Sequence, residues 1–164
     1  MIRRRRTLIC YTALLALLIL IDRISKDMAL FSLAGKDVDV FPGLTLSLSM
    51  NRGISCSLIT PQTANGYWIL AGIIGTLLIG FFAYAVFEFR QNRSLVFEIF
   101  IFAGGISNFL DRILLGGVVD FIDFHVMGWH WPTFNVADIC VVAGAIGIIM
   151  RTWYGAFQNP KNVR

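Results

Sequence analysis

An uncharged run of twenty-one residues, from Tyr67 to Phe87, most constrains what this chain can fold into. As an α-helix the run would be about 32 Å long, at roughly 1.5 Å per residue. The hydrocarbon core of a bilayer is about 30 Å thick, so the run matches a membrane-spanning helix in both length and composition. We therefore expect a membrane protein.

Three other hydrophobic segments predict three more spans. The predicted spans cover about 7–28, 67–87, 95–115 and 134–152, and several have polar ends. The overall composition agrees, because 57% of the residues are hydrophobic and 15% are charged, which is not the balance of an ordinary soluble domain. The predicted fold class is an all-α membrane protein with four transmembrane helices. Since the spans use most of the length, we expect one integral membrane domain over residues 1–164.

Lysine and arginine residues predict the orientation of these spans. They gather at the two ends of the chain and in the short loop after the second span, whereas the last outer loop, 116–133, has none. By the positive-inside rule both termini are cytoplasmic. The alternative is that residues 1–21 are a cleavable secretory signal. An uncleaved anchor is favoured, because Asp22 and Arg23 follow the apolar stretch where a small-residue cleavage site would be needed.

The first outer loop has a different periodicity. In the segment LTLSLSM, 44–50, apolar residues alternate with hydroxyl-bearing ones, which is the pattern of a half-buried strand. The residues Phe41-Pro42-Gly43 before it and Asn51-Arg52-Gly53 after it predict turns. We expect a small extracytoplasmic β platform within about residues 36–60.

Polar residues that a bilayer would exclude gather at the outer ends of the predicted spans. An ionisable residue at such a depth is a functional-site hypothesis by default. Asp120 and Asp138 are the strongest candidates, because each flanks an almost charge-free hydrophobic run. Asp138 is four residues past Phe134, so a helix that starts there carries it only about 6 Å inward, near the interface.

Structural roles are open for several of these residues. Asn135 could cap a helix that has Asp138 in its first turn, where the helix dipole stabilises a carboxylate. Asp22 and Lys26 are four residues apart and could form an ion pair on the surface of a helix. Asp123 could be a solvated loop charge.

No metal or other cofactor is predicted. His125 and His130 have no partner cysteine nearby and are typical of interfacial residues rather than zinc ligands. The three cysteines, Cys10, Cys56 and Cys140, do not have the spacing of metal ligands.

Two other classes of function fit a small protein with four spans. A proton-coupled transporter also uses intramembrane ionisable residues, but it needs them at the midplane, where the second span has none. A non-catalytic chaperone or anchor would not need both Asp120 and Asp138. Nucleic-acid binding is not predicted, since a basic cluster beside a span usually sets topology and contacts anionic lipids.

Five sequence blocks occur in order at the outer ends of the predicted spans: DRISK, NRG, GGISNFLDR, GGVVDFIDF and FNVAD. Together they resemble the motifs of the lipoprotein signal peptidase (signal peptidase II) family over nearly the whole chain. A single block such as FNVAD would be weak evidence. Five blocks in order are highly specific.

This resemblance implies a membrane aspartyl endopeptidase that removes the signal peptide from diacylglyceryl-modified prolipoproteins by cleaving before the lipidated cysteine. It implies the bacterial cytoplasmic (inner) membrane, an active site near its outer face, and prolipoproteins and membrane lipids as partners. The implied catalytic residues are Asp120 and Asp138. The implied supporting residues are Asp22, Lys26, Asn51, Asn108, Asp111, Arg112 and Asn135.

General chemistry agrees with such a role for two close carboxyl groups. If they share one proton, the ionised group activates a water molecule while the protonated group hydrogen-bonds to the scissile carbonyl. The chain departs from the usual family pattern at Ile54-Ser55-Cys56, after the NRG turn, and at Ser107, which stands where a glycine is usual. These departures concern the shape of the substrate pocket.

Overall fold

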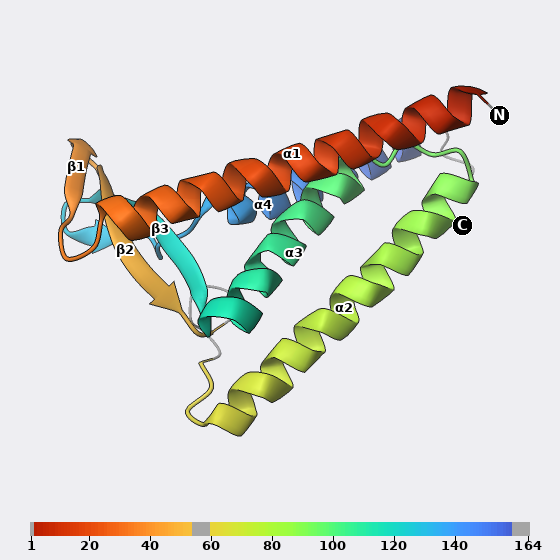
Figure 1. Cartoon of the computed structure of the whole chain (residues 1–164). Coiled ribbons are helices and arrows are strands. Elements are labelled where there is room, and N and C mark those ends of the chain that lie inside the picture. Colours follow the sequence, from red (N-terminus) through yellow and green to blue (C-terminus); the bar gives the residue numbers. More distant parts are fainter. Residues whose placement is uncertain (1, 54–59, 159–164) are drawn as a thin grey trace.

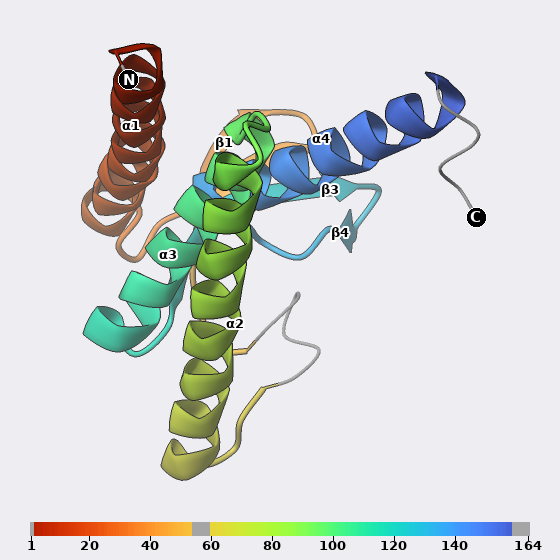
Figure 2. The ribbon, with the colours of Figure 1, turned by 90° about the vertical axis from the view of Figure 1, so that its right-hand side faces the viewer.

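The computed structural model describes residues 2–53 and 60–158, so Ile54-Ser55-Cys56 lie outside the described residues. Four helices account for most of this part of the chain: α1 (Ile2–Ser32), α2 (Ala64–Arg90), α3 (Val96–Leu115) and α4 (Val136–Gln158). Figure 1 shows α3 between α1 and α2, with the strands at the far end of α1. Figure 2, turned by 90°, shows that α4 points away from α2.

Three of the described helices are long and apolar enough to cross a membrane, over Arg4–Ser32, Ala64–Arg90 and Val136–Gly155. Helix α3 has 20 residues, enough for about 30 Å, but it carries Glu98, Asp111 and Arg112 near its ends. The predicted helices are therefore present, while a fourth crossing by α3 remains a prediction.

The sheet contains four antiparallel strands in the order β1-β2-β3-β4: β1 (Val38–Phe41), β2 (Leu44–Asn51), β3 (Val118–Val126) and β4 (Trp129–His130). The predicted strand is confirmed as β2. The predicted loop at about 36–60 contributes β1 and β2, and the other two strands of the small sheet come from 118–130, which the sequence did not indicate. The first four residues of β3 are all buried, so no apolar-polar alternation marks its start.

The sheet is fixed to the end of α1 by a small apolar cluster. Ala29 of α1 and Leu33, directly after α1, pack against Phe121 of β3, and all three are buried. Asp120 stands immediately before Phe121 on β3. The cluster therefore holds Asp120 against the helices.

Close packing of α3 on α4 sets the other half of the site. A Cβ atom added to Gly104 of α3 would lie 2.2 Å from the carbonyl oxygen of Ala137 in α4, so only glycine permits this approach. Asn108 is one turn after Gly104 and Asp138 directly follows Ala137. The contact at Gly104 thus brings Asn108 and Asp138 within reach of each other.

Candidate functional site

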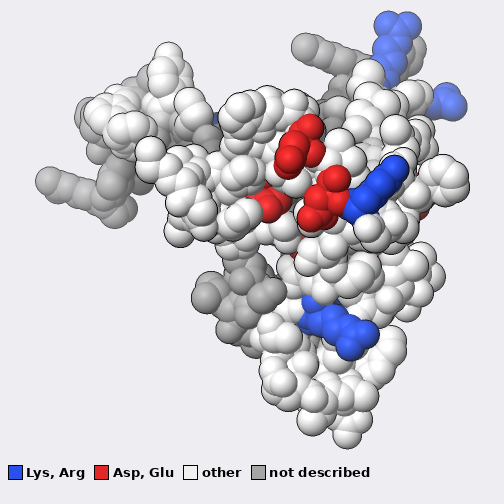
Figure 3. Space-filling view, turned by 90° about the vertical axis from the view of Figure 1, so that its left-hand side faces the viewer, with Lys and Arg blue, Asp and Glu red and all other residues white. Residues whose placement is uncertain are grey.

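The nine residues singled out in the sequence come together where α1, α3 and the first turn of α4 meet strands β2 and β3. Most of the charged ones are buried: Asp22, Lys26, Asp111 and Asp120 are at most 1% exposed. Seen from the end that carries the sheet, the surface is mostly uncharged, with a small group of acidic side chains and a few basic ones, one of them beside the acidic group (Figure 3). The charges of the site are thus largely hidden from solvent.

Asp120 projects from β3 and accepts two amide hydrogen bonds. Asn51 Nδ2, at the end of β2, donates to Asp120 Oδ2 at 3.0 Å, and Asn135 Nδ2 donates to Asp120 Oδ1 at 2.7 Å. The pKa of Asp120 is raised to about 6, mainly by burial and partly by the charge of Asp138, while the two amide donors oppose the rise. The Asp120 carboxyl group can therefore hold a proton at a much higher pH than an ordinary aspartate.

Asp138 and Asn135 cap the start of α4 reciprocally. The backbone N–H of Asp138 donates to Asn135 Oδ1 at 2.9 Å, and the backbone N–H of Asn135 donates to Asp138 Oδ2 at 3.2 Å. This is a capping box with asparagine and aspartate. The capping role considered for Asn135 is thus present, and Asp138 Oδ1 also accepts from Asn108 Nδ2 at 2.8 Å.

Asn135 is the link between the two candidate aspartates. Its side-chain amide donates to Asp120 and its backbone N–H donates to Asp138. Asn135 is completely buried, whereas Asp138 is partly exposed. The two carboxyl groups therefore face a common residue at the junction of β3 and α4, with Asp138 on the more open side.

Lys26 lies at the centre of the ionic part of the site. Its Nζ is 2.8 Å from Asp22 Oδ2 and 2.9 Å from Asp111 Oδ2, and it donates to Asn108 Oδ1 at 2.8 Å. The predicted pair of Asp22 and Lys26 exists, but in the interior rather than on a helix surface. By binding the oxygen of the Asn108 amide, Lys26 turns the amide nitrogen toward Asp138.

Asp22 connects this ionic cluster to α4. Its Oδ1 accepts the backbone N–H of Ala137 at 2.7 Å, and its Oδ2 accepts the hydroxyl of Ser107 at 2.6 Å. A contribution from Ser107 to the site was not predicted, although the serine had been noted as a departure from the family pattern. Arg23, which pairs with Asp111, was also missed.

Replacing Ser107 by alanine is expected to lower the free energy of unfolding by about 1–3 kcal/mol, because a buried carboxylate oxygen loses a hydrogen-bond donor. Thermal unfolding in detergent would measure the change. Thr76→Val is a suitable control, since it removes an exposed hydroxyl that bonds only to its own helix. Equal stability of the wild type and Ser107→Ala would contradict this role.

Arg112 fixes the end of the first outer loop. Its Nη2 donates to the carbonyl oxygen of Gly53 at 2.6 Å and its Nη1 to that of Asn108 at 3.2 Å. The carbonyl oxygen of Arg112 in turn accepts the hydroxyl of Tyr67 at 2.7 Å. Arg112 therefore ties α3 to the turn that follows Asn51.

Asp123 lies apart from this network. It is buried, not solvated as considered from the sequence, and both of its oxygens are within 3.0 Å of His130 Nδ1. The rings of His130 and His125 stack with centroids 5.0 Å apart. Among the described residues no group of three His, Cys, Asp or Glu side chains is arranged to hold a metal ion.

The chain is similar to known proteins over most of its length. Residues 14–154 match the family model described as signal peptidase (SPase) II. Proteins called lipoprotein signal peptidase are 36% identical in Blochmanniella pennsylvanica, over 76% of both chains, and 34% identical in a Methylobacterium species, over 97% of this chain and 98% of the relative.

The fold also resembles that of solved proteins. A bacterial membrane enzyme determined by the in meso method at 2.3 Å resolution matches with a TM-score of 0.73 and 23% identity, over 94% of this chain and 92% of the enzyme. A second such structure, at 1.9 Å resolution, has a TM-score of 0.69 and 24% identity, over 87% of this chain and 92% of that chain. The match to the family model and the identity to these relatives show that the chain belongs to the signal peptidase II family.

Proposed function

We propose that this protein is an aspartyl endopeptidase of the bacterial inner membrane that removes signal peptides from diacylglyceryl-modified prolipoproteins. Asp120 and Asp138 are its catalytic pair. The observation that carries this proposal is that both carboxyl groups hydrogen-bond to Asn135, although they come from different elements of the fold. Membership of the signal peptidase II family supports the reaction and its substrate class.

In the proposed mechanism the pair shares one proton. The ionised carboxylate removes a proton from a water molecule, which attacks the scissile carbonyl carbon, while the protonated carboxyl group hydrogen-bonds to the carbonyl oxygen. The proton is later delivered to the departing amine. The raised pKa of Asp120 supports this arrangement, although the pair titrates as a unit and the proton belongs to neither residue alone.

The supporting residues hold the pair in position. Asn51 and Asn135 direct N–H groups at Asp120, and Asn108 directs one at Asp138. Lys26 fixes the Asn108 amide, and Asp22 fixes the first turn of α4 through the N–H of Ala137. Because buried hydrogen bonds already hold the two carboxyl groups in place, these groups need to rearrange little during the reaction.

The proposed site lies near the outer face of the membrane, with both termini cytoplasmic and the whole chain acting as one domain with four spans. A substrate signal helix can then lie among the spans while its lipid chains stay in the bilayer. A transport path is less well supported, because α3 has no charged residue between Glu98 and Asp111 to line the membrane interior.

The direct test uses the purified protein in lipid vesicles with a synthetic prolipoprotein in two forms, with and without diacylglycerol on the lipobox cysteine. We expect one cut, immediately before the lipidated cysteine, and no cut in the unmodified form, as shown by the masses of the products. Cleavage at another bond, or equal cleavage of both forms, would contradict the proposed specificity.

The rate of processing is expected to fall as the pH rises through the raised pKa of Asp120, about 6. Below this pH the pair keeps its shared proton, and above it both carboxylates are ionised and the acid is lost. A pH profile of kcat/KM between pH 4 and pH 9 measures the effect, with precursor stability followed in parallel. A rate that does not change from pH 5 to pH 9 would contradict the shared proton.

A further inference from the structure

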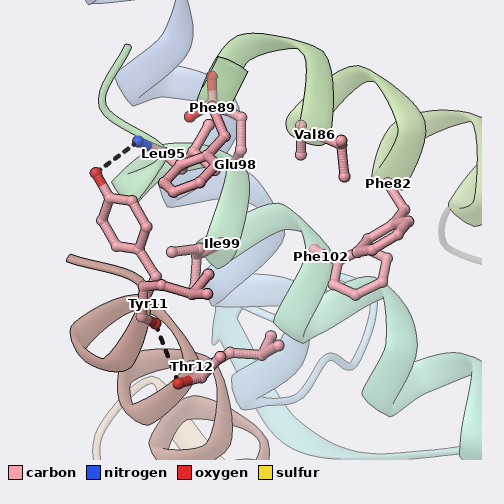
Figure 4. Close-up of a pocket in the computed structure, with 12 residues that line it drawn as sticks. Tyr11, Thr12, Phe82, Val86, Phe89, Leu95, Glu98, Ile99 and Phe102 are labelled. Atoms are coloured by element: carbon pink, nitrogen blue, oxygen red, sulfur yellow. Dashed lines mark hydrogen bonds between the residues drawn. The ribbon is translucent and has the colours of Figure 1, made fainter. Parts of the chain in front are cut away.

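An apolar cavity lies far from the aspartates, between the first turns of α1 and the last turns of α2. Its volume is about 200 Å³. Leu8 and Tyr11 of α1 line one wall, Phe82 and Phe89 of α2 line the other, and Ile99 of α3 is at the floor (Figure 4). Among the described residues no Cα atom of α1 lies within 8 Å of one in α2, and the two helices meet here through side chains such as Tyr11 and Phe89, which leaves a groove between them above α3.

The end of the groove is closed by neutralised polar groups. Glu98 is 1% exposed and pairs with Arg151, while Tyr11 accepts the backbone N–H of Leu95 through its hydroxyl at 3.2 Å. The charge of Glu98 is thus neutralised, and the Tyr11 hydroxyl has a hydrogen-bond partner. The cavity therefore has an apolar interior with no unpaired buried charge.

The rim of the groove is strongly basic. The guanidinium group of Arg4 lies 4.9 Å from the centre of the Phe89 ring, directly beside the cavity. Arg4, Arg5, Arg6 and Arg90 are exposed, and none of them forms an ion pair with a described carboxylate. Arg4 therefore places a positive charge without a described counter-ion beside the apolar groove, and three more such arginines lie on the neighbouring turns of α1 and α2.

We propose that this groove binds an anionic glycerophospholipid, with an acyl chain in the cavity and the phosphate beside Arg4. The occupant follows from the combination of apolar lining and basic rim. A zwitterionic lipid would supply the chain but no net charge. Each arginine near the headgroup is expected to favour the anionic lipid by about fivefold in affinity.

The signal helix of a substrate fits the groove less well. A signal peptide has a positively charged first region, which the arginines beside the groove would repel. The lipid site is therefore separate from the proposed peptidase activity.

The test is retention of lipid by the purified protein, counted by native mass spectrometry after exposure to equal amounts of phosphatidylglycerol and phosphatidylcholine with the same acyl chains. We expect several-fold more phosphatidylglycerol than phosphatidylcholine on the wild type. Arg4→Gln should reduce this preference about fivefold. Lys36→Gln is the matched control, because it removes one exposed positive charge after the other end of α1.

A second variant tests the cavity itself. Ala85 lines the groove, and Ala85→Phe would fill it, so retention of phosphatidylglycerol should fall while Arg4 is still present. Equal retention of the two lipids by the wild type, or equal effects of Arg4→Gln and Lys36→Gln, would overturn the proposal. Displacement of the lipid by a synthetic signal-helix peptide would also overturn it and assign the groove to the substrate.

Discussion

Replacing either Asp120 or Asp138 by asparagine is expected to abolish processing of a diacylglyceryl-modified prolipoprotein. Asparagine can neither take a proton from water nor give one to the departing amine. Loss of general acid-base catalysis alone lowers rates by about 10²–10⁴-fold, and each variant removes half of a pair that works as a unit. Single-turnover assays in membranes would measure the decrease.

Folding must be measured beside activity in these variants. Both oxygens of Asp120 accept hydrogen bonds from NH₂ groups, those of Asn51 and Asn135. An asparagine at position 120 places its own NH₂ group against one of these donors, at a cost of about 1–3 kcal/mol. Asp138→Asn meets a similar conflict with Asn108 or with the N–H of Asn135.

Asp123→Asn is the matched control for this experiment. Asp123 is on the same strand as Asp120 and is also buried, but the two residues are three positions apart, so their side chains point to opposite faces of the sheet. Its partner is His130, outside the network of the pair. We expect near wild-type processing by Asp123→Asn, and full turnover by either Asp120→Asn or Asp138→Asn would refute the assignment.

The helices could be predicted from the sequence because hydropathy acts over long uniform segments. The run from Tyr67 to Phe87 lies within α2, and the alternating residues of 44–50 form β2. Strand β3 could not be found in this way. Its pairing with β2 depends on a contact between segments about seventy residues apart, and its buried start has no alternation to reveal it.

The membership of the site could be predicted, but its geometry could not. The positions of Asp22 and Lys26 suggested a surface pair, because spacing along a helix says nothing about which other helices cover that face. Helix α3 covers this face and buries the pair, and Lys26 also contacts Asp111 and Asn108 of α3. The sequence does mark Ser107 as unusual, because a serine stands where a glycine is usual. It does not indicate the partner of the hydroxyl, Asp22 on α1, which lies 85 residues away.

Replacing Lys26 by methionine is expected to be the most destabilising change of a single residue in the site. Methionine fills a similar volume, but Asp22 and Asp111 then remain buried without their shared cation. Removing one partner of a buried ion pair costs about 3–5 kcal/mol, a large part of the roughly 5–15 kcal/mol that stabilises a typical protein. Thermal unfolding in detergent would show a much lower Tm.

The double variant Lys26→Met/Asp22→Asn should recover part of this loss. An asparagine at position 22 has no charge, its oxygen can still accept the N–H of Ala137, and the Ser107 hydroxyl can rotate to accept from its NH₂ group. A double-mutant cycle should therefore give a coupling energy of about 0.5–3 kcal/mol. A coupling energy of zero would mean that Lys26 does not stabilise Asp22.

Arg23→Gln separates the effect of burial from that of charge, because Arg23 and Lys26 both pair with Asp111. The Arg23 side chain is 30% exposed and that of Lys26 is 0% exposed. We expect Arg23→Gln to cost less stability than Lys26→Met, because Arg23 is the more exposed cation and Asp111 keeps Lys26 as a partner. It should also leave processing nearly unchanged, since Arg23 does not contact Asn108. The double variant Lys26→Met/Asp22→Asn should instead process slowly at a temperature where it is fully folded. The Asn108 amide that faces Asp138 has then lost the charged one of its two donors and keeps only Asn135.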